Sequence, residues 1–204
     1  MSAVRALTGL AWRDTKQPMS ETIPDIETVR SRLMEARLFQ RLWAFDPRWV
    51  GSIPLDIHGP DADVDIACSA GPDLDAFRQH LEAELSGHDV QVTRNTHAGE
   101  PSIIARFSLD GLPVEIFGRT RPVETHESYV HWLAEDRILR LAEDRLRTDI
   151  RAIKLDGLKT EPAFARALDL GGDPYVELLK LASPGDDALG QLIQTAGYAL
   201  KPEA

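Results

Sequence analysis

The chain has 204 residues, 43% of them hydrophobic, which is enough for one sizeable core or for a core domain with a helical appendage. Its 23 basic and 33 acidic residues give a formal net charge of -10, which disfavours binding to long nucleic acids or anionic lipid. No apolar run approaches the roughly 18 residues of a membrane span, and the single cysteine, Cys68, has no disulfide partner within the chain. We therefore expect a cytoplasmic protein with no membrane partner.

The first half of the sequence predicts a helix, two strands, a helix and three strands. Residues 1–22 show no sustained period and are expected to form a loose extension. Residues 25–45 repeat apolar residues at helical spacing and end at Asp46-Pro47. A short strand at Trp49-Val50 then runs into Gly51-Ser52, and a loop leads to a second strand, "DVDIAC".

A helix is predicted next over residues 72–87, followed by the strands "DVQVTRNT", "SIIARFSLDG" and "LPVEIFG". The Asp110-Gly111 pair between the last two is a strong hairpin signal. After Pro122 helical patterns dominate, at about 124–146, 148–156, 161–169, 174–183 and 186–197. This order predicts an α+β fold, with a sheet covered by helices on one face. We expect a core over 23–120 and a C-terminal helical region over 121–204 packed on it.

Carboxylates are concentrated on one face of two of these strands. In "DADVDIAC", Asp63 and Asp65 point away from Val64 and Ile66, because side chains alternate along a strand. In "LPVEIFG" the same alternation sets Glu115 apart from its apolar neighbours. If the two strands are adjacent, three carboxylates share one face and repel one another unless a cation resides there. A hard divalent cation such as Mg²⁺ suits these oxygen ligands.

A solvated polar face is the ordinary alternative, since half-covered sheets alternate in this way. The combination of elements favours a site over that alternative. Gly51-Ser52 ends a strand, Asp-x-Asp follows in the next strand, and a later strand carries one more acid.

That arrangement, Val50-Gly51-Ser52, Asp63-Val64-Asp65 and Glu115, resembles the DNA polymerase beta-like nucleotidyltransferase superfamily. Within it, the words "GSIP", "DVDIAC", "VEIFG" and "GLKTEPAFARALDLGGDPYVELLKL" look like an uncharacterised bacterial family, a domain of unknown function, over about residues 28–182. The resemblance implies a nucleotidyltransferase-like mixed sheet. One departure is the third acid, which is Glu where Asp is more usual.

The resemblance also implies roles for these residues. Asp63 and Asp65 would hold two Mg²⁺ ions that bind a nucleoside triphosphate, and Glu115 would be the third ligand or the general base. Gly51 and Ser52 would contact phosphate, although a simple turn is the alternative. Lys159 is the best of four candidate cations for the phosphates, the others being Arg119, Arg121 and Lys154, and a well-made turn is the alternative there too.

The function expected from the resemblance is a metal-dependent nucleotidyltransferase that moves AMP from ATP onto a hydroxyl of a small molecule, a protein or an RNA end. Two alternatives stay open. One is a non-catalytic nucleotidyltransferase-like module that binds a nucleotide or a protein. The other is a toxin-antitoxin component that modifies a protein or transfer RNA.

Overall fold

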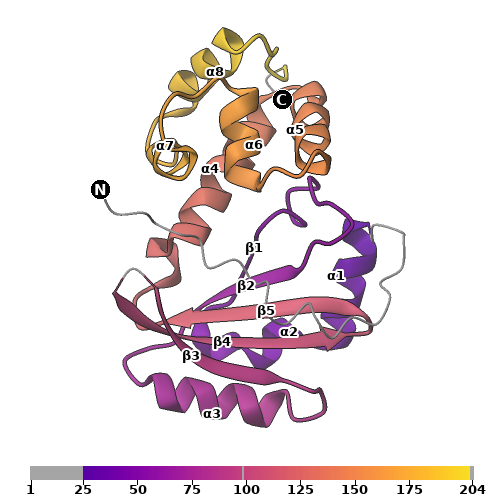
Figure 1. The fold of residues 1–204 in the computed structure, drawn as a ribbon, viewed down its shortest axis with the longest axis vertical. Coiled ribbons are helices and arrows are strands. Elements are labelled where there is room, and N and C mark those ends of the chain that lie inside the picture. Colours follow the sequence, from indigo (N-terminus) through magenta and orange to yellow (C-terminus); the bar gives the residue numbers. More distant parts are fainter. Residues whose placement is uncertain (1–24, 98, 203–204) are drawn as a thin grey trace.

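A computed structural model of the chain describes residues 25–97 and 99–202, so the predicted extension over 1–22 lies outside the described residues. The described part has a five-stranded mixed sheet in one half and a group of helices in the other (Figure 1). The α+β prediction is confirmed. None of the described helices is long and apolar enough to cross a membrane.

The sheet has the strand order β1-β2-β5-β4-β3, in which β2 and β5 are parallel and the other neighbours are antiparallel. Its strands are β1 (Arg48–Val50), β2 (Val64–Ser69), β3 (Gln91–His97), β4 (Glu100–Leu109) and β5 (Leu112–Arg119). The predicted hairpin joins β4 to β5. Asp110 and Gly111 both have positive φ, 49° and 84°, as a two-residue turn of the favoured twist requires. The turn fixes the register of the two strands.

Three helices, α1 (Ile26–Glu35), α2 (Leu38–Arg41) and α3 (Leu74–Glu84), pack on one face of the sheet around a first hydrophobic core. The single helix predicted over 25–45 is interrupted, because Arg37 adopts a left-handed conformation with φ 51°. A 3-10 turn, Trp43–Phe45, completes that segment. The alternation of β2 and β5 puts Val64, Ile66 and Ile116 into this core.

The C-terminal half encloses a second hydrophobic core. After a 3-10 turn (Val123–Thr125) come α4 (Glu127–Leu141), α5 (Asp144–Leu155), α6 (Thr160–Ala167), α7 (Pro174–Lys180) and α8 (Asp186–Thr195). The helix predicted over 124–146 is broken at Ala142, which is extended and bridges to Leu200. Leu55 and Ile57, from the loop between β1 and β2, are buried in this second core. That loop therefore links the sheet to the helices.

Candidate active site

The parallel pairing of β2 with β5 brings two of the predicted acids side by side. Asp65 lies directly opposite Glu115 in the register, on the face away from the core residues Val64 and Ile66. Asp63 immediately precedes β2 and is close enough to raise the pKa of Asp65. Two residues that are 50 apart in sequence thus bring their carboxylates together, because a parallel ladder aligns residues of the same face.

Gly51 brings the loop after β1 against Asp65. Its φ is 81°, and a Cβ atom built at this position would lie 2.3 Å from Asp65 Oδ2. Any other residue would both strain the backbone and displace the carboxylate. The sequence reading predicted a close backbone approach to a phosphate at Gly51, and the close approach that the structure shows is to the Asp65 carboxylate.

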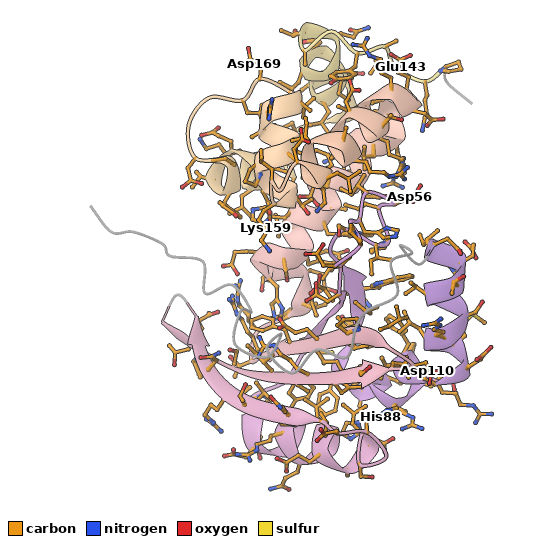
Figure 2. All side chains as sticks on the ribbon, turned by 45° about the vertical axis from the view of Figure 1, so that its right-hand side comes forward. Asp56, His88, Asp110, Glu143, Lys159 and Asp169 are labelled. Carbon is orange, nitrogen blue, oxygen red and sulfur yellow. The ribbon has the colours of Figure 1, made fainter. Side chains whose placement is uncertain are left out.

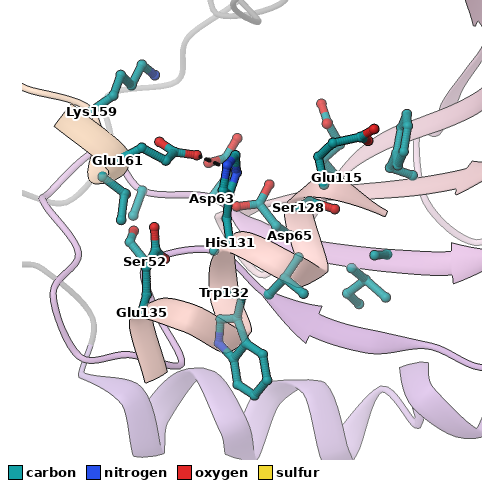
Figure 3. Close-up of a pocket in the computed structure, with 18 of the residues that line it drawn as sticks. Ser52, Asp63, Asp65, Glu115, Ser128, His131, Trp132, Glu135, Lys159 and Glu161 are labelled. Atoms are coloured by element: carbon teal, nitrogen blue, oxygen red, sulfur yellow. Dashed lines mark ion pairs between the residues drawn. The ribbon is translucent and has the colours of Figure 1, made fainter. Parts of the chain in front are cut away.

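A cavity of about 930 Å³ opens between the sheet and the helices, and all six predicted site residues line it. Its size is that of a pocket for a ligand such as a nucleotide. Gly51, Ser52, Asp63, Asp65 and Glu115 belong to the sheet half. Lys159, just before α6, lies on the helical side (Figures 2 and 3). Ser52 therefore lines the same cavity as the acids and is half-buried.

Burial raises the pKa of Asp65 well above its usual range, and the nearby carboxylates of Asp63 and Glu115 raise it further. The positive charge of Lys159 acts in the opposite direction. This perturbation follows from placing like charges in a partly enclosed cavity. The site thus favours a bound proton or a bound cation near Asp65.

Arg106 is a residue of the site that the sequence reading missed. It faces Glu115 across the β4–β5 ladder, and its Nη2 atom lies 2.5 Å from Glu115 Oε2. Burial raises the pKa of Glu115, while Arg106 opposes that rise. The Asp110-Gly111 turn was the available signal, because a two-residue hairpin that pairs Leu109 with Leu112 also pairs Arg106 with Glu115.

The donor set has the chemistry of a magnesium site. Asp63, Asp65 and Glu115 supply carboxylate oxygens, the ligands that Mg²⁺ prefers. Over residues 25–97 and 99–202, no three His, Cys, Asp or Glu side chains converge closely enough to hold a metal by themselves. Mg²⁺ typically takes one or two protein carboxylates and completes its shell with phosphate oxygens and water. The two aspartates fit that kind of site, and Glu115 is partly committed to Arg106.

The helical wall of the cavity carries ionisable residues, of which the sequence had suggested only Lys154 as part of the site. His131 Nδ1 on α4 lies 3.4 Å from Glu161 Oε1, the ion pair drawn in Figure 3. Glu135 is buried, and burial raises its pKa well above the usual range. Lys154 donates to the Thr160 hydroxyl, and burial lowers its pKa. These residues come from α4, α5 and α6, which only the packing of those helices brings together.

The arginines suggested as phosphate contacts are engaged with carboxylates. Arg119 Nη1 lies 2.6 Å from Glu127 Oε2, and Arg121 Nη2 lies 2.7 Å from the same atom. Both also contact Glu100. Lys159 has no ion pair among the described residues in this structure, which keeps it the better candidate for binding a phosphate.

Comparison with known proteins gives one family and a group of similar folds. A family model described as "Domain of unknown function (DUF4269)" matches residues 31–181, about three quarters of the chain. No curated protein sequence matches.

Two solved structures of the Cid1 poly(U) polymerase, one with MgGTP and one with Mg 3'-dATP, align with a TM-score of 0.50. They are 14% and 15% identical in sequence, and each alignment covers 76% of this chain. A cytoplasmic RNA terminal U-transferase aligns with a TM-score of 0.49. The chain spans about half the length of these proteins, 49%, 48% and 46% respectively. The likeness to the two Cid1 structures shows a shared nucleotidyltransferase-like fold.

Proposed function

The chain belongs to the family described as a domain of unknown function, DUF4269, and we propose that it is a magnesium-dependent nucleotidyltransferase that transfers AMP from ATP to a hydroxyl group. The observation that supports this most is the pairing of Asp65 with Glu115 across parallel strands, beside Asp63 and in one cavity with Ser52 and Lys159. The solved Cid1 structures with Mg²⁺ and nucleotides have a similar fold.

Each residue has a role in this proposal. Asp63 and Asp65 would hold two Mg²⁺ ions, which would supply charge stabilisation at the phosphates and at the attacking oxygen. The Ser52 hydroxyl donates a hydrogen bond to a phosphate oxygen. Lys159 provides a positive charge from the helical side of the cavity. Glu115 receives the proton of the attacking hydroxyl. Arg106 holds the Glu115 carboxylate in position.

Metal linkage tests this proposal without knowledge of the acceptor. Mg²⁺ that binds the folded site stabilises the fold by about 2.7 kcal/mol at a hundredfold excess over Kd. The melting temperature should therefore rise with Mg²⁺, and rise further with Mg²⁺ plus ATP. Asp65→Asn should lose most of this response. Its metal-free form should be at least as stable as the parent, because one buried, repelled charge is removed.

The matched control is Asp75→Asn, in the Asp-x-Asp at residues 73–75. Asp75 lies in the first turn of α3 and pairs with Arg94 on the surface, away from the cavity. This variant can be slightly less stable overall, but its Mg²⁺ response should equal that of the parent. Equal responses from the Asp65 and Asp75 variants would show that the site carboxylates are only a solvated face.

The Arg106–Glu115 pair favours a second candidate, a non-catalytic nucleotide-binding module, because a carboxylate held by arginine accepts a proton less readily. Incubation with labelled ATP and a cell extract separates the two functions. A module would show the Mg²⁺-ATP stabilisation but would transfer no label, whereas the enzyme would label an acceptor. A toxin-antitoxin component would label a protein or transfer RNA.

A further inference from the structure

The floor of the cavity extends past Glu115 along the face of β4 and β5 that is opposite the first hydrophobic core. Ile104 pairs with Phe117, and Ser102 pairs with Arg119, so these four side chains form two successive rows beyond the acid. All four line the cavity. Arg119 is the fourth residue after Glu115 along β5, a span of roughly 13 Å between their Cα atoms. On this part of the cavity floor, the apolar row of Ile104 and Phe117 therefore separates the acidic end at Glu115 from a polar end at Ser102 and Arg119.

The polar end has two buried groups whose hydrogen bonding is incomplete. Ser102 is 0% exposed and Arg119 is 3% exposed. Within the described part of the chain, Ser102 Oγ and Arg119 Nε have no hydrogen-bond partner. Leaving such atoms unpaired is unfavourable, so buried polar groups normally have partners. Both atoms can donate a hydrogen bond, and both residues line the cavity, so an oxygen atom of a ligand that reached them would accept from them.

The charge of this region is balanced by the protein itself. Arg106 pairs with Glu115, and Arg119 and Arg121 share Glu127. A polynucleotide needs arginine or lysine side chains free to contact successive phosphates. The described arginines of this face are already paired with carboxylates. The region is therefore better suited to a small molecule than to an RNA strand.

We propose that the acceptor of the transfer is a small planar molecule with a hydroxyl at one end and a carbonyl or carboxylate oxygen at the other. This rests on the proposed nucleotidyl transfer. The flat part packs on Ile104 and Phe117, and the far oxygen accepts from Ser102 and Arg119. The hydroxyl oxygen forms the new bond to the α-phosphorus of ATP, the bond from that phosphorus to the bridging oxygen breaks, and pyrophosphate leaves. The hydroxyl proton passes to Glu115.

A binding experiment tests the acceptor surface without relying on activity. The probe is 4-hydroxycinnamate, which is planar and has a hydroxyl and a carboxylate at opposite ends, observed by saturation-transfer NMR. It should bind the parent protein, and Ser102→Ala should weaken it about tenfold through loss of one hydrogen bond. Phe117→Leu should weaken it as well. Ser102→Ala should still fold, because its hydroxyl has no hydrogen-bond partner among the described residues.

The matched control is Ser108→Ala, on the same strand and the same face but exposed and outside the cavity. It should bind the probe as the parent does. If the parent does not bind the probe, or if Ser102→Ala binds it equally well, the proposal is overturned.

A second measurement uses labelled ATP with the small-molecule, protein and RNA fractions of a cell extract. The label should enter the small-molecule fraction, and Ser102→Ala should raise the KM for that fraction about tenfold with the KM for ATP unchanged. Label in RNA or protein alone would overturn the proposal. If the probe binds as expected but no fraction is labelled, the nucleotidyl transfer fails and the binding surface stands.

Discussion

Among the site residues, Gly51 is the position that least tolerates a side chain. A methyl group there would meet Asp65 Oδ2, and the φ of 81° disfavours residues with a Cβ. We predict that Gly51→Ala lowers stability and removes the Mg²⁺-induced rise in melting temperature. The conformational part of the cost is about 1 kcal/mol.

Gly111→Ala is the matched control, because Gly111 has a φ of 84° and, its chain neighbours aside, no atom of a described residue lies within 4 Å of the position of a Cβ. It should have a similar backbone cost and keep the whole Mg²⁺ response. Thermal melts with and without Mg²⁺ measure the metal response of each variant. A Gly51→Ala variant that still responds fully would mean that the contact with Asp65 does not shape the metal site.

The lowered pKa of Glu127 predicts that the stability of the fold depends on pH. Burial opposes ionisation, but a hydrogen bond from its own backbone amide and the charges of Arg119 and Arg121 prevail and lower its pKa from 4.5 to about 2. A carboxylate with a lowered folded-state pKa stabilises the fold above the unfolded pKa and loses that effect as the pH falls through the folded pKa. The parent should therefore lose stability as the pH falls from about 4.5 to about 2.

The variant Glu127→Gln should show a shallower fall in that range. At neutral pH it should be less stable by at most about 1 kcal/mol, because the pair is partly exposed. Urea unfolding at several pH values measures both effects. Parallel pH profiles for parent and variant would contradict the assignment of this dependence to Glu127.

At the scale of elements, the contact between α3 and β5 depends on Gly118. A Cβ atom at Gly118 would lie 2.2 Å from Phe77 Cε1, so the aromatic ring of α3 packs directly on the strand backbone. We predict that Gly118→Ala costs about 1–3 kcal/mol, the usual range for overpacking a core. Because β5 carries Glu115 three residues earlier, the same change should also weaken the Mg²⁺ response.

Shortening Phe77 should relieve the clash. The double variant Gly118→Ala with Phe77→Leu should therefore lose less unfolding free energy than the two single variants lose when their losses are added. Chemical denaturation of the four proteins gives this coupling. Strict additivity would show that the ring and the strand do not limit each other.

At the scale of the whole molecule, the loop between β1 and β2 joins the two cores. Its Ile57 is fully buried among the C-terminal helices, and Arg147 and Arg151 of α5 donate to the backbone oxygens of Leu55 and Asp56. We predict that Ile57→Ala costs about 2–5 kcal/mol and that the protein still unfolds in one transition. Two separate transitions in calorimetry would show that the cores are independent.

Local rules in the sequence determined the elements and the faces of the strands. Alternation assigned Asp65 and Glu115 to the face opposite Val64 and Ile66, and the Asp110-Gly111 pair predicted the hairpin, because strand geometry and turn conformation depend on neighbouring residues. Helix ends were less predictable. The break at Ala142 and the left-handed Arg37 depend on what the flanking helices pack against.

Tertiary structure alone decided which side chains share the cavity. The parallel pairing of β2 with β5 brought the acids together, and the packing of α4, α5 and α6 placed Lys159, Glu135 and the His131–Glu161 pair opposite them. The unpaired Ser102 and Arg119 atoms also follow from burial that no local pattern records. These contacts join residues distant in sequence, so they depend on how whole elements pack rather than on the period of any one segment.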